Sequence, residues 1–231
     1  MNYEWILFDA DETLFHFDAY AGMQRMLGAY GVEWEERHYE EYQVVNRPLW
    51  VDYQDGRITA ADVQQRRFAS WAERLQVCPL SLNSAFLSAM ADICRPLEGA
   101  VSLLESLHGR ARMGIITNGF GELQQIRLER TGLAHHFELV VISEIVGAAK
   151  PHPEIFRYAL EKMGNPAPDR VLMVGDNPDT DIFGGIQAGL DTCWINWKGK
   201  PAPPGIVPDH EVTSLRQLEE LLALKSGCAS R

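Results

Sequence analysis

Short apolar segments alternate with amphipathic segments over the second half of the chain. Strands are predicted at residues 112–117, 139–143, 170–175 and 192–196, and helices at 121–130, 153–163, 180–188 and 214–223. Each apolar segment is brief and is ended by polar residues, which is typical of a strand buried on both faces of a parallel sheet. The alternation predicts an α/β fold, a doubly wound parallel sheet with helices on both faces.

A further apolar run, residues 5–8, is separated from these elements by a long helical segment. One isolated strand cannot satisfy its backbone hydrogen bonds, so this run must join the same sheet. The segment from about residue 17 to about residue 95 is then an insertion after the first strand. We expect residues 1–16 and 96–231 to form a Rossmann-like core, and residues 17–95 to form an α-helical cap over the strand ends.

Local signals predict two helices of the insertion in more detail. Thr59 is expected to cap a helix that runs without interruption to Leu75, with Arg67 on the same stripe as its apolar residues. Ser81 is expected to cap the next helix. Residues 198–208 are rich in proline and glycine and predict a surface loop.

Composition limits the class of partner. The net charge of −11 argues against a nucleic acid polymer, because there is no basic surplus to displace phosphate counterions. We see no apolar run long enough to cross a membrane and no secretion signal. The scattered Cys78, Cys94, Cys193 and Cys228 predict free thiols in a reducing cytosol. We therefore expect a cytoplasmic protein with a small-molecule substrate, as a monomer or weak homo-oligomer.

Asp9 and Asp11 come directly after the first predicted strand. Ligands of open parallel sheets bind at the carboxyl ends of the strands, so both acids are expected where chemistry takes place. Two neighbouring acids repel each other unless a cation or a proton lies between them. The alternative interpretation is an ordinary turn, in which one aspartate caps the following helix.

Three later segments also place polar groups at strand ends or in adjoining loops. Thr117 and Asn118 end a strand before a helix, a good cradle for phosphate oxygens, although Thr-Asn-Gly is also a common turn. Lys150 precedes a proline that fixes the backbone, whereas a lone loop lysine is usually solvated. Asp176 and Asp181 follow the strand at 170–175. Together with Asp9 and Asp11, these groups predict a compact site of hard oxygen ligands that suits Mg²⁺, with Mn²⁺ or another divalent ion as a substitute.

The four segments resemble a known set of motifs. Asp9–Thr13, Ile116–Asn118, Lys150–Pro151 and Gly175–Asp176 with Asp181 are similar to the four ordered motifs of the haloacid dehalogenase (HAD) superfamily. The helical insertion resembles the first cap type of that superfamily, and the likeness covers nearly the whole chain. Residues 9–15, 47–53, 70–75 and 116–132 further resemble the bacterial pyrimidine 5′-nucleotidases, house-cleaning nucleoside monophosphate phosphatases. Glu12 departs from the commoner pattern, which has glycine there.

The resemblance implies a Mg²⁺-dependent phosphomonoesterase that acts on nucleoside 5′-monophosphates. Pyrimidine substrates are implied, namely UMP, dUMP, TMP and non-standard analogues. Asp9 would be the nucleophile that forms an aspartyl-phosphate, and Asp11 the general acid and base. A carboxylate at position 11 also favours phosphate esters over carbon–halogen bonds, because a departing halide needs no proton.

The same resemblance implies the remaining roles. Phosphate oxygens would be bound by Thr117, Asn118 and Lys150. The metal ion would be held by Asp9, Asp176 and the backbone carbonyl of Asp11, with Asp181 as an outer-shell or variable ligand.

Selectivity for the leaving group must come from the cap and from the loop after Thr13. The aromatic candidates for covering a base are Phe15, Phe17, Trp50, Tyr53, Phe68 and Trp71. Aromatic faces stack on bases, but aromatic residues at helical spacing more often belong to the core.

Two other functions compete with this one. A sugar-phosphate phosphatase or a phosphomutase would use the same scaffold. A receiver-like signalling domain, phosphorylated on aspartate without turnover, is also doubly wound, although the large insertion and the position of Asp11 argue against it.

Overall fold

The centre of the molecule is a six-stranded sheet in which every strand pair is parallel. The computed structural model describes residues 3–224. The strands are β1 (Trp5–Phe8), β2 (Arg112–Thr117), β3 (Leu139–Ile142), β4 (Val171–Gly175), β5 (Asp191–Ile195) and β6 (His210–Val212). Their spatial order is β3-β2-β1-β4-β5-β6. The predicted doubly wound sheet is confirmed, with the first strand at its centre; the short β6 was not predicted.

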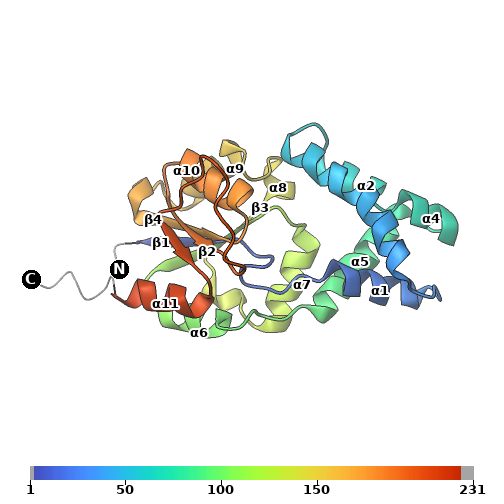
Figure 1. Cartoon of the computed structure of the whole chain (residues 1–231), viewed down its shortest axis with the longest axis horizontal. Coiled ribbons are helices and arrows are strands. Elements are labelled where there is room, and N and C mark those ends of the chain that lie inside the picture. Colours follow the sequence, from blue (N-terminus) through green and yellow to red (C-terminus); the bar gives the residue numbers. More distant parts are fainter. Residues whose placement is uncertain (1–2, 225–231) are drawn as a thin grey trace, which may run out of the picture.

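Helices cover both faces of the sheet (Figure 1). One face is covered by α6 (Ala100–Leu107) and α11 (Leu215–Leu224), and the other by α9 (Pro153–Lys162) and α10 (Phe183–Gln187). The alternation of side chains along β1 explains why both layers are needed. Ile6 and Phe8 pack in the cluster that includes α6 and α11, whereas Leu7 packs in the cluster that includes α9.

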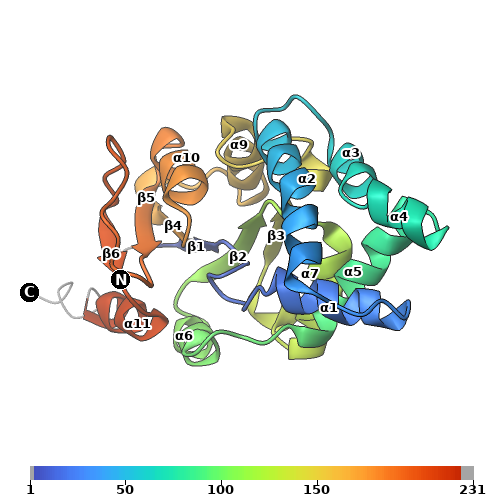
Figure 2. The same ribbon diagram turned by 45° about the vertical axis from the view of Figure 1, so that its right-hand side comes forward.

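Five helices from the predicted insertion lie together beside the sheet (Figure 2). They are α1 (Ala19–Ala29), α2 (Glu36–Gln54), α3 (Ala60–Arg66), α4 (Ala69–Leu75) and α5 (Pro79–Ile93). They share an apolar cluster of their own, which Phe120, Leu123 and Ala149 join from the rest of the chain. This separate cluster supports the division into core and cap at residues 17–95, which stays a prediction.

Two details of the predicted insertion are wrong. Thr59 does cap a helix, accepting a hydrogen bond from Asp62 N, but α3 ends at Arg66 and α4 begins at Ala69. The interruption allows Phe68 to be completely buried in the apolar cluster of the cap. Ser81 is not a cap, because α5 already begins at Pro79, where proline is favoured in the first helical turn.

Two bulk predictions can be compared with the structure. Cys78, Cys94 and Cys193 are free thiols, as expected, and Cys228 lies outside the described residues. Within residues 3–224, no helix has both the length and the apolar character needed to cross a membrane.

Candidate active site

Three carboxylates converge where the two central strands end. Asp9 follows β1 and Asp176 follows β4, and the backbone N–H of Asp9 donates to the Val174 carbonyl at 2.8 Å. Asp181 lies on the short helix η3 (Pro178–Ile182). Each of the three aspartates offers an oxygen, and these oxygens all lie within 4.8 Å of one another. The parallel register of β1 and β4 therefore produces the predicted acidic cluster.

Gly175 makes room for this cluster. A Cβ atom at position 175 would lie 2.2 Å from Oδ2 of Asp181, which is closer than any real contact. The same Oδ2 accepts a hydrogen bond from the backbone N–H of Asn177 at 3.1 Å. Glycine at the end of β4 is thus required for the Asp181 carboxylate to fold back beside the strand.

Lys150 is the cation at the centre of the cluster. Its Nζ lies 2.6 Å from Oδ1 of Asp9 and 2.8 Å from Oδ1 of Asp181, and it donates to the Ile116 carbonyl at 2.7 Å. The side chain is 1% exposed. The sequence predicted an aimed lysine here, and the structure places it between two of the predicted acids.

Asn118 holds Lys150 in place. The Asn118 amide nitrogen donates to the Lys150 carbonyl at 2.9 Å, and its amide oxygen accepts from the Lys150 N–H at 2.7 Å. Both polar ends of this side chain are therefore engaged with the backbone of Lys150, and the expected role of Asn118 in binding phosphate stays a prediction. The Thr117 hydroxyl is buried next to it and accepts a hydrogen bond from the Gly119 N–H at 3.1 Å.

The cluster contains more acidic groups than cationic groups. Burial raises the pKa of Asp9 to about 7, even though the Lys150 ammonium favours its carboxylate form. Burial, reinforced by the charges of Asp181 and Asp9, raises the pKa of Asp176 to about 8. Burial by itself would lower the pKa of Lys150, but Asp181 and Asp9 outweigh it and the pKa is raised. One ammonium does not balance three acids, of which Asp9 and Asp181 are buried and Asp176 is half-buried, so the donor set fits a divalent cation.

Asp11 lines the cavity that adjoins this cluster. It is held by Arg127, a residue that the sequence analysis missed. Arg127 Nη1 forms an ion pair with Oδ1 of Asp11. The Arg127 side chain is 1% exposed, and its guanidinium lies 4.7 Å from the centre of the Phe15 ring. An arginine at an inward position of the amphipathic helix α7 (Gly121–Thr131) is the only signal in the sequence that points to it.

Glu12 shows how the departure from the commoner motif is accommodated. Its backbone adopts a left-handed conformation with φ of 57°, which glycine would reach without strain. Its carboxylate accepts a hydrogen bond from the Phe17 N–H at 2.6 Å. The side chain therefore fixes the start of the loop that leads into the cap.

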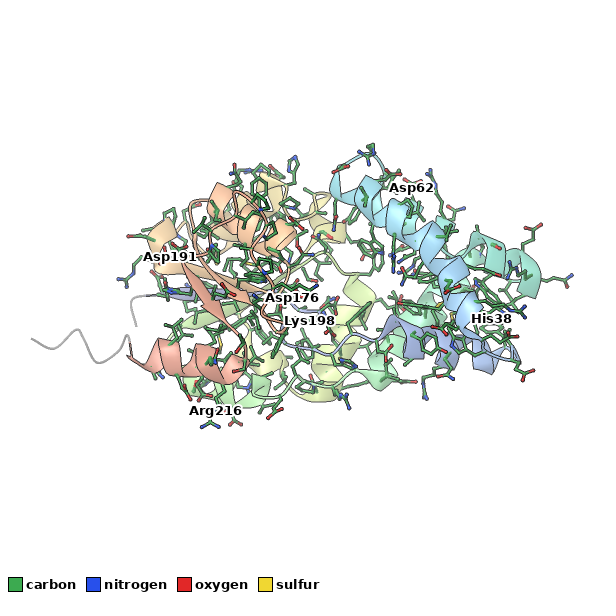
Figure 3. The ribbon with its side chains drawn as sticks, viewed as in Figure 1. His38, Asp62, Asp176, Asp191, Lys198 and Arg216 are labelled. Carbon is green, nitrogen blue, oxygen red and sulfur yellow. The ribbon has the colours of Figure 1, made fainter. Side chains whose placement is uncertain are left out.

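A cavity of about 430 Å³ joins the acidic cluster to the cap. This size suits a small-molecule ligand. Its walls include Asp9, Asp11, Glu12, Phe17, Tyr42, Gln43, Asn46, Trp50, Arg67, Phe86, Thr117, Asn118, Phe120, Lys150, Asp176 and Asp181. In Figure 3, Asp176 lies on the core, whereas His38 and Asp62 lie on helices of the cap.

The cavity separates the aromatic candidates into two groups. Phe17 and Trp50 line it, and Trp50 packs against Phe120 with ring centres 5.3 Å apart. The other four are not among its lining residues, which gives no support to their expected role in covering a base. These are Phe15, Tyr53, Phe68 and Trp71, all of which are buried in apolar clusters. Arg67 and Phe120 line the cavity although the sequence analysis did not select them.

Comparison with known proteins agrees with this geometry. The model of the haloacid dehalogenase-like hydrolase family matches residues 3–189. Pyrimidine 5′-nucleotidase YjjG of Escherichia coli is 59% identical over 96% of this chain and 99% of its own length. Pyrimidine 5′-nucleotidase PynA of Streptococcus pneumoniae is 30% identical over 96% of each chain.

A solved structure shows the same arrangement over the full length. YfnB from Bacillus subtilis, crystallised with bound magnesium, superposes with a TM-score of 0.80 at 28% identity, covering 95% of this chain and 98% of its own. The fold, the acidic cluster and the sequence relatives agree, and the chain belongs to the haloacid dehalogenase-like hydrolases.

Proposed function

We propose that the protein is a Mg²⁺-dependent 5′-nucleotidase that hydrolyses pyrimidine nucleoside monophosphates such as UMP, dUMP and TMP. The observation that carries the proposal is the convergence of Asp9, Asp176 and Lys150 on one cavity that continues into the cap. The identity of 59% to a pyrimidine 5′-nucleotidase supports the choice of substrate.

The reaction proceeds in two displacements. A carboxylate oxygen of Asp9 attacks phosphorus, the bond from phosphorus to the 5′ oxygen breaks, and Asp11 gives its proton to the departing nucleoside. A water molecule then attacks the phosphorus of the aspartyl-phosphate, and Asp11 takes a proton from that water molecule. The bond between phosphorus and Asp9 breaks, which releases inorganic phosphate and restores the carboxylate.

The chain supplies donors for the charge that develops on the phosphate oxygens. Lys150 provides an ammonium fixed by three contacts, and Thr117 provides a hydroxyl. Asn118 serves by holding the backbone of Lys150 in place. Arg127 positions Asp11 at the cavity wall through their ion pair.

Asp9 and Asp176 are the residues that would hold Mg²⁺, with the backbone carbonyl of Asp11 and with Asp181 as the variable partner. The bound ion supplies positive charge that allows an anionic nucleophile to approach an anionic phosphate. Asp181 already accepts from Lys150 and from the Asn177 N–H, so we assign it to positioning Lys150 as well as to the outer surroundings of the ion.

A panel of phosphate esters tests the proposal. Phosphate release is measured with UMP, dUMP, TMP, AMP and a hexose phosphate, each with Mg²⁺, with Mn²⁺ and with chelator. The three pyrimidine substrates with carbonyl groups at C2 and C4 should give the highest kcat/KM, and chelator should abolish release. Preference for the hexose phosphate, or a stable phosphoprotein without release of phosphate, would refute it.

A further inference from the structure

The cap contributes one buried cation to the cavity, and the proposed chemistry does not use it. Arg67 follows α3 at the break before α4, is 5% exposed and lines the cavity that contains Asp9. Its neighbour Arg66 points to the surface and forms an ion pair with Asp62.

No carboxylate neutralises Arg67 in the described part of the chain. Its Nε and Nη2 both donate to the amide oxygen of Asn83. These contacts account for two of the five N–H donors of a guanidinium. A buried arginine with neutral partners and donors to spare is costly unless a ligand completes its surroundings.

The surroundings of Arg67 are otherwise aromatic. Its guanidinium carbon lies 5.0 Å from the ring centre of Phe68, 5.1 Å from that of Phe86 and 4.9 Å from that of Phe120. Phe120 also packs against Trp50, and both rings line the cavity. The cap wall thus combines flat apolar surfaces, which suit the faces of a nucleobase, with one strong donor for its edge.

The chemistry of the substrate indicates which atoms of the base can accept a hydrogen bond from Arg67. In a nucleoside monophosphate, the phosphate is the anionic group, and Lys150 and the acidic cluster occupy its end of the cavity. The base of UMP, dUMP or TMP carries carbonyl oxygens at C2 and C4, which only accept hydrogen bonds. A guanidinium only donates, so the two are complementary.

We propose that Arg67 is a specificity-determining residue that donates a hydrogen bond to a carbonyl oxygen of the pyrimidine base, with its guanidinium oriented by Asn83. The inference rests on the proposed function, because it assigns the base end of the same cavity.

Arg67→Met tests the inference, with Arg66→Met, at the exposed last residue of α3, as the matched control. The activity of each Mg²⁺-loaded enzyme is measured with UMP and with p-nitrophenyl phosphate, which has no nucleobase. Arg67→Met should lower kcat/KM for UMP about 10- to 100-fold, mainly through KM, and leave p-nitrophenyl phosphate within about threefold. Arg66→Met should change neither activity. Arg67→Lys should give a kcat/KM for UMP between those of wild type and Arg67→Met, because lysine keeps the positive charge but lacks the paired N–H donors of a guanidinium.

The ratio of the two activities within one preparation does not depend on how much of the variant folds. A second readout is inhibition of p-nitrophenyl phosphate hydrolysis by uridine, whose inhibition constant should rise by a similar factor in Arg67→Met. Equal losses on both substrates, or unchanged inhibition by uridine, would show that Arg67 only supports the cap and would overturn the inference. Wild-type enzyme that hydrolyses p-nitrophenyl phosphate but not UMP would instead refute the proposed function, and the inference with it.

Discussion

The two ends of the cavity are built on different principles. At the core end, carboxylates and one ammonium are packed within hydrogen-bond distance at the ends of parallel strands. At the cap end, aromatic rings surround a single guanidinium whose partners are neutral. The core end is specified by charge and the cap end by shape, so the first is suited to one reaction and the second to choosing among substrates.

The two ends also differ in what holds their residues. Asp9 and Asp176 are fixed by backbone hydrogen bonds of the sheet and by the adjoining turn. Arg67 and Trp50 depend on how separate helices pack. Changes at the core end should therefore alter the rate with every phosphate ester, and changes at the cap end should alter mainly the discrimination between esters.

The largest effect is expected at the nucleophile. Asp9→Asn should lower kcat with UMP and with p-nitrophenyl phosphate by about 10⁴-fold or more, because an amide cannot form the acyl-phosphate. Asp169→Asn, at an exposed site, is the matched control. Phosphate release and circular dichroism are compared in both proteins. Retained turnover in a folded Asp9→Asn protein would remove the residue from its role.

Lys150 should have the next largest effect. Lys150→Met removes the ammonium between Asp9 and Asp181, and kcat/KM should fall about 10²- to 10³-fold with both esters. The exposed Lys200→Met variant should match wild type. A loss of activity confined to UMP would contradict the assignment of the core end to the chemistry shared by all phosphate esters, because it would make Lys150 a determinant of specificity.

Divalent metal should stabilise the core end more strongly as pH rises. The folded-state pKa values of Asp9 and Asp176, about 7 and about 8, lie above their ordinary value of 3.8. In metal-free protein, folding is therefore favoured by protonation of these groups. Their contribution to stability is fully present below about pH 4 and is lost as pH rises towards 8.

Thermal melting measures this linkage. At pH 8, Mg²⁺ at a hundredfold excess over its Kd at that pH should raise Tm by about 5–10 °C relative to chelator, and the same Mg²⁺ concentration should give a smaller rise at pH 6. An equal shift at both pH values would show that the ion does not compete with protons at Asp9 and Asp176.

The smallest effect is expected from stacking at the cap end. Trp50→Ala should raise KM for UMP about tenfold, because base–aromatic stacking is lost, and leave kcat nearly unchanged. Val44→Ala on the exposed side of the same helix is the control, since that side chain is 76% exposed. A fall in kcat equal to the rise in KM would place Trp50 at the reacting end instead.

The sequence by itself determined the fold class and the core end of the cavity. Asp9, Lys150 and Asp176 each follow a readable local signal, and the carboxyl ends of parallel strands must meet at one edge. Connection rules therefore brought together residues up to 167 positions apart without knowledge of any side-chain contact. The same reasoning located the helical insertion, although it missed the break between α3 and α4.

Only the tertiary structure decided which aromatic residues reach the cavity. Phe17 and Trp50 line it, whereas Phe15 and Trp71 are buried in apolar clusters, and nothing in their spacing distinguishes them. Helix packing angles and a single irregular turn set these orientations, and they depend on contacts among many residues. The helical pattern already placed Arg67 on the apolar stripe of the cap, but only the packing showed that this position lines the cavity.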